Sequence, residues 1–320
     1  MRRMMRRLRG ERGATALIFG LLLVPLLGVM AISLDVGALY VERDQLQNGA
    51  DAAALAVAAD CADGNGCTSP GPIAASYASA NANDGSAATL QPTFPTNHSV
   101  TVSTSTLETD GTTAIHHPFA SLIGIDSTTV HAEATAEWGS PSAGNVLPIA
   151  VAYCEVATVA KGTRVLIQYD ENKPCKGPSG QPIKGGFGWL DQLPGQCQAY
   201  VDLASAYVGS NPGLDPPNNC TSIFAGLEDQ VVLIPIYDER PSVNGQKGQF
   251  HIVAFAALQV TGWKFTGSGN SIMNNPDSLA PKCTGNCRGI QGFFVDRVEV
   301  GGDWELGGPS LGLNVVHLID

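Results

Sequence analysis

The strongest pattern in the chain is an uninterrupted apolar stretch close to its N-terminus. The 22 residues from Gly13 to Leu34 carry no charge. As a helix that rises 1.5 Å per residue, they would be about 33 Å long, enough to cross a hydrocarbon core of about 30 Å. Pro25 lies in the middle of the stretch, where a membrane helix tolerates proline with at most a kink. The pattern predicts a transmembrane helix over residues 13–34.

The charges on either side of this stretch predict its orientation. Residues 1–12 hold six arginines and one acidic residue, a net charge of +5 in a chain whose total is −11, so the rest carries −16. By the positive-inside rule, the basic tip stays in the cytoplasm and residues 35–320 lie beyond the membrane. A cleaved secretory signal is the alternative, although the apolar stretch of such signals spans only about 7–15 residues. Under either interpretation the body is exported.

A helical pattern continues beyond the apolar stretch. Apolar residues recur at spacings of three and four, and no proline occurs between residues 26 and 69. This spacing places them on one face of a helix. We expect the membrane helix to continue as one rod to about Asp60, and the Gly- and Pro-containing residues 64–72 to end it. The apolar face packs either against the chain's own domain or against a partner. It consists of Val36, Leu39, Leu46, Ala50, Ala53 and Val57.

Residues 11–60 also carry a set of short motifs in a fixed order. Arg12-Gly13 precedes the apolar run, and Leu34-Asp35-Val36-Gly37 and Tyr40 follow it. Leu46-Gln47-Asn48 and an alanine-rich block around Asp51 come next. In this order the segment resembles the N-terminal segment of TadG-like proteins of the Tad (tight adherence, Flp-type) pilus assembly system. The resemblance covers about a sixth of the chain. The motif residues that it marks are Asp35, Tyr40, Gln47, Asn48 and Asp51.

The resemblance implies a membrane-anchored accessory protein of a surface pilus, with other Tad pilus assembly proteins or pseudopilins as partners. Two departures from the patterns of related proteins limit what the resemblance implies. Prepilins carry a glutamate five residues after the glycine at which they are cut, but here Ile18 follows Gly13 and Thr15 follows Gly10 at that distance. We therefore do not expect polymerisation as a pilin. The Asp-x-Ser-x-Ser metal motif of longer TadG-like proteins is also missing from the sequence.

Past residue 60, the hydrophobic pattern is that of short strands and long loops. Residues 99–107 and 128–138 alternate apolar and polar positions, which predicts two half-buried strands. With a short helix at residues 73–83 they would form a small α+β module. Residues 139–144 are predicted to be a linker.

The remainder of the chain predicts a β-rich domain, a sandwich or a barrel, in which residues 197–208 are the best helical candidate. The predicted fold class is thus α+β: a basic tip (1–12), a transmembrane helix (13–34), a region with a long helix and a small β module (35–139), and a β-rich, disulfide-bonded domain (140–320). The predicted strands of that domain are residues 146–152, 164–169, 230–237, 250–261 and 293–300.

All eight cysteines follow the apolar stretch, and an even number of cysteines outside the cytoplasm predicts disulfides. Closeness in sequence favours two pairs, Cys61–Cys67 and Cys283–Cys287, and leaves the others open. Zinc is the alternative, but only Cys283-x3-Cys287 approaches the required spacing and no second set matches it. The cysteines are Cys61, Cys67, Cys154, Cys175, Cys197, Cys220, Cys283 and Cys287.

Other candidate chemistry is sparse. The sequence has no G-x-S-x-G elbow, P-loop or H-E-x-x-H motif. The adjacent side chains of His116 and His117 point apart, and His251 has no evident partner. Asp238-Glu239 is predicted to be a solvated turn beside Arg240. The acidic body also has no basic stretch to neutralise phosphates. We therefore predict no catalytic residue, cofactor, metal, small-molecule substrate or nucleic-acid partner.

Together these features predict a non-catalytic, membrane-anchored component of Tad/Flp-type pilus assembly on the bacterial surface, with its body outside the cytoplasm. Two alternatives stay open. An exported envelope hydrolase would be favoured by a cleft that contains carboxylates with perturbed pKa values. A tethered adhesin or binding module would be favoured by exposure of Trp189 or Trp263 beside a shallow groove.

Overall fold

The structure is a computed structural model that describes residues 11–63, 67–169, 173–211, 215–239, 248–265, 272–300 and 304–319. Most of the predicted basic tip, together with Arg240, lies outside these residues. The chain divides into two compact units. The N-terminal unit comprises Met1–Val57, Ser69–Ala136 and Ile319–Asp320, and the C-terminal unit comprises Ala58–Thr68 and Glu137–Leu318. The predicted α+β fold class is confirmed.

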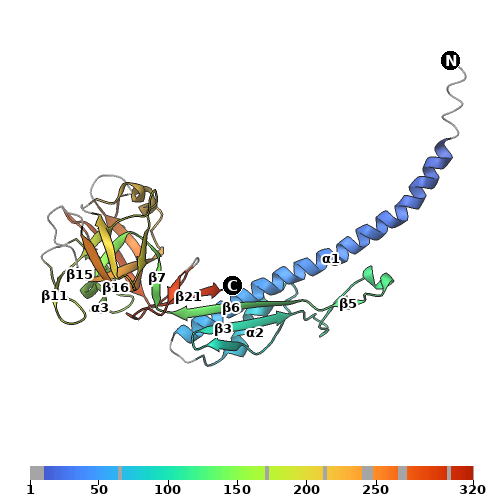
Figure 1. Ribbon diagram of the computed structural model, residues 1–320, viewed down its shortest axis with the longest axis horizontal. Coiled ribbons are helices and arrows are strands. Elements are labelled where there is room, and N and C mark those ends of the chain that lie inside the picture. Colours follow the sequence, from blue (N-terminus) through green and yellow to red (C-terminus); the bar gives the residue numbers. More distant parts are fainter. Residues whose placement is uncertain are drawn as a thin grey trace, which may run out of the picture. The chain divides into compact units, whose positions relative to one another are not determined.

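The dominant element of the N-terminal unit is α1 (Glu11–Ala62), a continuous helix of 52 residues (Figure 1). Pro25 lies inside it without ending it, and the helix stops within two residues of the predicted end. The helix contains a stretch that is long and apolar enough to cross a membrane, and none of that stretch is buried. A single long helix through both the apolar stretch and the amphipathic stretch is thus confirmed.

The second half of α1 packs against its own unit. Leu46, Ala50, Ala53 and Val57 are buried, which favours the first of the two expected roles of this face. Thr104 donates a hydrogen bond to the carbonyl oxygen of Leu46 at 3.0 Å. The covering elements are α2 (Pro70–Asn81), β1 (Ala88–Thr89), β2 (Thr93–Thr96), β3 (Ser99–Ser105) and β6 (His131–Gly139), with β3 between β1 and β6 and also paired to β2.

Burial in this sheet follows the alternation predicted from sequence. Val100 and Val102 of β3 are buried, as are Ala132 and Ala134 of β6. A separate small hairpin, β4 (Ile115–His116) and β5 (Ser127–Thr128), carries the 3-10 turn η1 (Ala120–Ile123) between its strands. Figure 1 shows this hairpin extending beside α1 away from β3.

The C-terminal unit is built on one large sheet whose pairings close into a ring. Going round, β14 pairs with β12, β12 with β8, β8 with β15, β15 with β16, and β16 again with β14. Only the β8–β15 pairing in this ring is parallel. Of the two predicted architectures, a sandwich or a barrel, the closed ring of strands corresponds to the barrel. Its strands are β8 (Ile149–Ala152), β12 (Phe187–Leu190), β14 (Tyr207–Asn211), β15 (Val231–Glu239) and β16 (Gln249–Lys264).

Further strands extend this sheet from β16, and smaller sheets lie beside it. β18 (Gly289–Val295) and β17 (Met273–Asn274) pair with β16, and β9 (Val165–Gln168) pairs with β18. Two smaller sheets of this unit are β13 (Ala199–Asp202), β7 (Pro141–Val146) and β20 (Glu305–Leu306), and β10 (Pro174–Lys176) and β11 (Pro182–Lys184). β19 (Arg297–Glu299) and β21 (Asn314–Ile319) pair in parallel. The short helices are α3 (Tyr153–Ala157), η2 (Asn218–Cys220) and α4 (Thr221–Phe224).

Both faces of the large sheet are buried, which explains its long apolar runs. Along β16, Ala256 and Leu258 belong to one hydrophobic cluster, whereas Phe255 and Ala257 belong to the other. The first cluster contains a group of aromatic rings. Phe224 and Phe265 have ring centroids 4.8 Å apart, and further edge contacts join Phe187, Trp189 and Tyr169.

Two predictions about residues 139–208 are wrong. Residues 197–208 do not form a helix, because Ala199 and Val201 alternate burial with their neighbours and pair with β7 in β13. Residues 139–144 are not a linker, because Ala143 and Gly144 pair with β13 as part of β7. A Cβ on Gly144 would overlap the ring of Trp304, so this glycine permits close packing inside the sheet rather than flexibility.

All eight cysteines lie in four disulfides: Cys61–Cys67, Cys154–Cys175, Cys197–Cys220 and Cys283–Cys287. Disulfide bonding is confirmed, and both favoured short-range pairs are present. The zinc alternative needed the thiolates of Cys283 and Cys287, which are bonded to each other. Within the described residues, no cluster of three or more potential metal ligands occurs.

The last turn of α1 belongs to the C-terminal unit. Arg297 donates to the carbonyl oxygen of Ala59 at 3.0 Å and pairs with Asp63 at 2.6 Å. Asn314 donates to the carbonyl oxygen of Ala62 at 2.7 Å. The Asn314 bond satisfies one of the carbonyl groups that a helix C-terminus leaves without a partner, and the Arg297 cation is favourable at that end of the helix dipole.

Candidate functional site: an anchor helix and a cavity

The first candidate site is the surface of α1 over residues 17–34. Large apolar side chains are exposed on every side of the helix there, among them Leu17, Phe19, Leu22, Leu26 and Val29. A helix that is apolar all round belongs either in a protein core or in a membrane, and no protein covers this one. The surface is therefore compatible with a single-pass membrane anchor, whose predicted landmarks are Gly13, Pro25 and Leu34.

The family motif residues that follow the anchor divide into two groups. The carboxylate of Asp35 is buried, and Gln47 donates to Asp51 at 2.8 Å and to the carbonyl oxygen of Glu133 at 3.1 Å. The Gln47 bond to Glu133 joins α1 to β6, and the bond to Asp51 lies within α1. Tyr40 and Asn48 are exposed and remain accessible to a partner.

Glu42 lies in the same part of α1. Its pKa is raised above the ordinary value, first by burial and then by the nearby carboxyl groups of Glu108 and Asp84, while a hydrogen bond with Thr106 opposes the shift. Burial therefore penalises the charged form of this carboxyl group. By linkage, this carboxyl group stabilises the fold less as the pH rises through its folded pKa.

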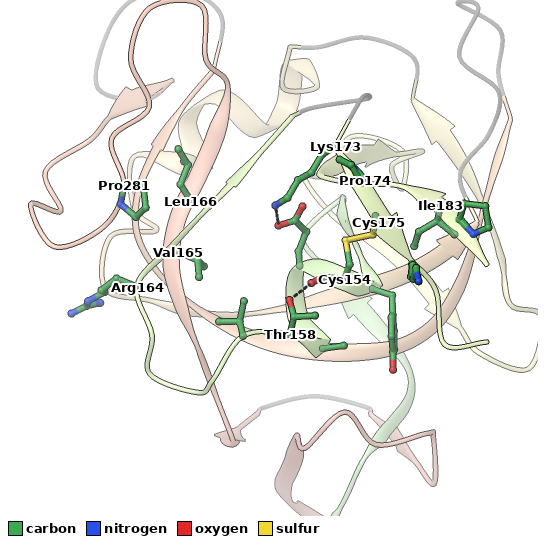
Figure 2. Close-up of a pocket in the computed structure, with 16 residues that line it drawn as sticks. Cys154, Thr158, Arg164, Val165, Leu166, Lys173, Pro174, Cys175, Ile183 and Pro281 are labelled. Atoms are coloured by element: carbon green, nitrogen blue, oxygen red, sulfur yellow. Dashed lines mark hydrogen bonds and ion pairs between the residues drawn. A yellow bond between two sulfur atoms is a disulfide. The ribbon is translucent and has the colours of Figure 1, made fainter. Parts of the chain in front are cut away.

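The second candidate site is a cavity of about 760 Å³ in the C-terminal unit (Figure 2). Its volume lies within the range of about 300–1,000 Å³ that is typical of small-ligand pockets. Val165 and Leu166 line one side, and the Cys154–Cys175 disulfide lines the other (Figure 2). Most of the lining is apolar, and it is contributed by α3, β9, β10, β11 and the segments that join them.

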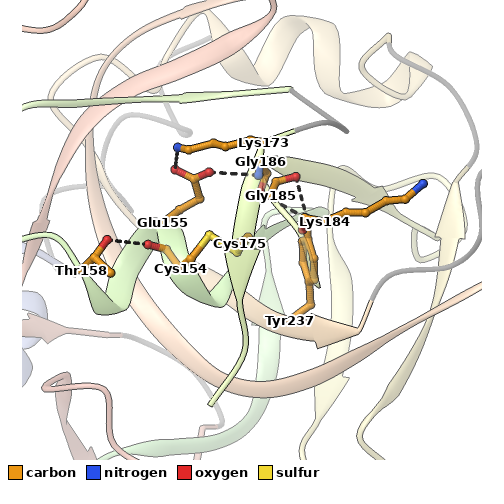
Figure 3. Close-up of polar contacts among 9 residues, drawn as sticks. All are labelled: Cys154, Glu155, Thr158, Lys173, Cys175, Lys184, Gly185, Gly186 and Tyr237. Carbon is orange, nitrogen blue, oxygen red and sulfur yellow. Dashed lines mark hydrogen bonds and ion pairs between the residues drawn. A yellow bond between two sulfur atoms is a disulfide. The ribbon is translucent and has the colours of Figure 1, made fainter. Parts of the chain in front are cut away.

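Glu155 is a buried carboxylate that lines this cavity, and Figure 3 shows its polar contacts. Glu155 accepts from Lys173 at 2.6 Å through Oε2 and from the backbone N–H of Gly186 at 3.0 Å through Oε1. Tyr237 donates to the carbonyl oxygen of Lys184 at 3.1 Å on the same segment. Both carboxylate oxygens are thus engaged within the protein. Glu155 therefore ties α3 to the segment before β12 and is poorly placed to act as a general base.

A second polar cluster joins strands β15 and β16. His251 Nδ1 lies 2.5 Å from Asp238 Oδ1, and the Tyr207 ring centroid is 4.9 Å from that of His251. They line a cavity of about 410 Å³. A hydrolytic triad would add a serine, threonine or cysteine to such a pair. None occurs among the described residues that line this cavity.

This cluster corrects the prediction of a solvated turn at Asp238-Glu239. Both residues belong to β15, and the Asp238 side chain is largely buried. Sequence alone gives His251 no partner, because the β15–β16 register brings the two residues together. The predicted strands at 230–237 and 250–261 follow one another in the sequence, and a register for a hairpin between them is the signal that would have revealed the pair.

A carboxylate with a lowered pKa lies elsewhere in the C-terminal unit. Asp277 accepts from Thr261 Oγ1 at 2.5 Å and from the backbone N–H groups of Leu279 and Ala280 at 2.9 and 3.2 Å. The Thr261 bond is the main cause of the lowered pKa, and Arg164, 3.7 Å away, adds to it. Asp277 and Glu42 line neither cavity.

We expect Asp277→Asn to lower the free energy of unfolding at neutral pH by roughly 2 kcal/mol, because charge-assisted hydrogen bonds are lost in a buried site. A lowered folded pKa gives stability that is present above the unfolded pKa of about 3.9 and is lost as the pH falls through the folded pKa. The difference from the parent should therefore shrink in acid. Urea unfolding of the full-length protein in detergent, at neutral and acidic pH, measures it.

The control for that measurement is Asp296→Asn, because Asp296 is exposed and forms only a surface ion pair of 3.5 Å with Lys161. Such pairs contribute about 0–1 kcal/mol. Equal effects of the two substitutions, or an Asp277→Asn effect that does not change with pH, would contradict the expectation.

Comparison with known proteins identifies the first of the two candidate sites. No curated protein and no solved structure matches this chain. Residues 13–60 match the family described as putative Flp pilus-assembly TadE/G-like. The matched residues span the exposed apolar surface, the five motif residues and the buried face of α1. Residues 13–60 of this chain are therefore a TadE/G-like segment, as their resemblance to TadG-like proteins of the Tad system indicates.

Proposed function

We propose that the chain is a membrane-anchored, non-catalytic component of Tad/Flp-type pilus assembly that presents an interaction domain outside the cytoplasm. The family match over residues 13–60 carries this proposal, because the matched helix has an apolar half that no protein covers. The arginine-rich tip supports a cytoplasmic N-terminus. Four disulfides in the exported part fit an oxidising compartment.

In this role the anchor contributes by confinement. A body that is held at the membrane meets other Tad assembly proteins or pseudopilins at a raised effective concentration, so weak contacts suffice. Tyr40 and Asn48 are the motif residues best placed to make such contacts, because they follow the apolar stretch on α1 and are exposed. The other three motif residues are engaged within the N-terminal unit.

The residues on which the two alternatives depend, for an envelope hydrolase or a tethered adhesin, favour neither of them. Trp189 and Trp263 are buried, so neither presents a ring for the stacking expected of an adhesin. The carboxyl groups with shifted pKa values, Glu42, Asp110 and Asp277, lie outside both cavities of the C-terminal unit. Glu155, the buried carboxylate of the larger cavity, already has two partners.

Deletion of the gene tests the proposal. We expect the deletion strain to lose its Flp-type pili, counted by electron microscopy, and full-length protein expressed in trans to restore them. Restoration by Tyr40→Ala should be weaker than by Tyr77→Ala, because both replace an exposed tyrosine on a helix of the N-terminal unit but only Tyr40 is a motif residue. Normal piliation in the deletion strain would remove the pilus role.

A further inference from the structure

The loop between β4 and β5 is an exposed apolar tip, which we call the hairpin loop (residues 117–126). Leu122 is 85% exposed and Ile123 66%, and Phe119 and Ile125 are exposed as well. Residues 111–125 contain no Asp, Glu, Lys or Arg, although the exported body is strongly acidic. Asp126, at the end of the loop next to β5, is its one charged residue. Four large apolar side chains gathered on the uncharged part of one loop indicate a surface that meets something other than water.

The hairpin loop is fixed in place rather than loosely attached. Asp35 Oδ2 accepts from the backbone N–H of Ala120 at 2.6 Å and from that of Phe119 at 3.1 Å. The backbone N–H of His117 donates to the carbonyl oxygen of Asp126 at 2.9 Å and so closes the loop. The ring nitrogen Nε2 of His117 lies 2.8 Å from Oγ1 of Thr128 in β5. The Asp35 side chain that receives the loop is only 5% exposed.

Asp35 also fixes the depth of the loop relative to the membrane. It is the first charged residue after the uncharged stretch 13–34, so it marks the level at which α1 leaves the hydrocarbon. Because Phe119 and Ala120 bond directly to its carboxylate, the loop lies at that same level, beside the helix (Figure 1). The loop thus brings its exposed apolar side chains beside the end of the exposed apolar stretch of α1.

We propose that the hairpin loop inserts into the bilayer interface on the side of the exported body, with Leu122 and Ile123 as its deepest side chains. The occupant of this surface is lipid, because the surface lies beside the apolar stretch of α1 and residues 119–125, which carry its exposed apolar side chains, contain no Asp, Glu, Lys or Arg to pair with a protein partner. Apolar side chains of interfacial segments enter about 5–10 Å below the headgroups. The insertion rests on the proposed membrane anchoring and does not depend on the pilus role.

A second attachment beside the anchor has a mechanical consequence. A lone membrane helix rotates and tilts freely, whereas anchors at the interface set both angles. The loop is hydrogen-bonded to Asp35. Its insertion into the interface would therefore fix the rotation of α1 about the helix axis. Tyr40, a little more than one turn further along α1, would then point in a defined direction.

The test uses full-length protein in phosphatidylcholine vesicles, with tryptophan placed at Leu122. As a matched control, Leu90→Trp replaces another exposed leucine of the same unit. The probe lipid carries bromine near the headgroup end of its acyl chains and quenches tryptophan at that depth. We expect the emission added by Leu122→Trp to fall by about twofold in brominated vesicles, and that of Leu90→Trp to stay constant.

Equal, small quenching at the two positions would overturn the proposal and leave a protein partner as the occupant of the loop. Cosedimentation of the same samples with vesicles after an alkaline wash reports the anchor separately. Protein that sediments but shows no quenching at residue 122 refutes the loop insertion alone. Protein that fails to sediment refutes the anchor, and the loop insertion with it.

Discussion

Replacing Leu22 and Leu26 with arginine together should abolish stable membrane insertion. The two side chains lie near the centre of the uncharged stretch and are exposed on α1. An arginine at the centre of a membrane helix costs about 2.5–3.5 kcal/mol on insertion scales, so the pair should cost about 5–7 kcal/mol. The expected result is loss of the protein from the membrane fraction after an alkaline wash, measured by immunoblot against the parent.

The matched control places two arginines at the same spacing on the part of α1 that follows the apolar stretch. Asp44 and Asn48 are exposed there. Asp44→Arg with Asn48→Arg should leave the protein in the membrane fraction at the parent level. Retention of the Leu22→Arg, Leu26→Arg variant would show that residues 13–34 do not hold the protein in lipid. Mass spectrometry of the washed parent settles cleavage, because an intact anchor contains residues 13–34.

Phe224→Ala should destabilise the C-terminal unit by about 3–5 kcal/mol, the usual range for removing a large aromatic side chain from a core. Phe224 is fully buried on α4, and its ring lies 4.8 Å from Phe265, 5.9 Å from Trp189 and 6.2 Å from Trp263 between centroids. The space that the missing ring leaves cannot easily collapse, because the Cys197–Cys220 disulfide fixes the chain just before α4. The substitution should therefore stand near the upper end of that range.

Urea unfolding of full-length protein in detergent, followed by tryptophan emission, measures this loss. Ile223→Ala serves as control, since Ile223 is the preceding residue on the same short helix and is 46% exposed. We expect it to change the unfolding free energy by no more than about 0.5 kcal/mol. A Phe224→Ala midpoint equal to that of the control would mean that the aromatic cluster does not hold this unit together.

The parts of the fold that sequence predicts are those with a strong local period. The helix α1 and the strands β3 and β6 have clear periods, and both faces of β15 and β16 are buried, so their apolar runs are long. β12 is harder to predict, because it is four residues long and contains a glycine. That glycine makes room for the ring of Phe250, a residue more than sixty positions away.

The candidate sites also differ in how far the sequence predicts them. The anchor and its motif residues lie on one continuous helix, so their order in sequence is their order in space. The wall of the larger cavity combines Glu155, Lys173 and Gly186, and the His251–Asp238 pair joins two strands. These arrangements depend on which strands pair and in what register, and hydrophobic period alone does not specify that.

The order of the disulfides bears on how the body matures. The cysteines pair consecutively along the chain, the first with the second, the third with the fourth and so on, at separations of 6, 21, 23 and 4 residues. If the body emerges from the membrane N-terminal end first, each newly exposed thiol finds either its own partner waiting or no free thiol at all. Oxidation in the order of emergence then yields the native set directly, so the chain has little need of a disulfide isomerase.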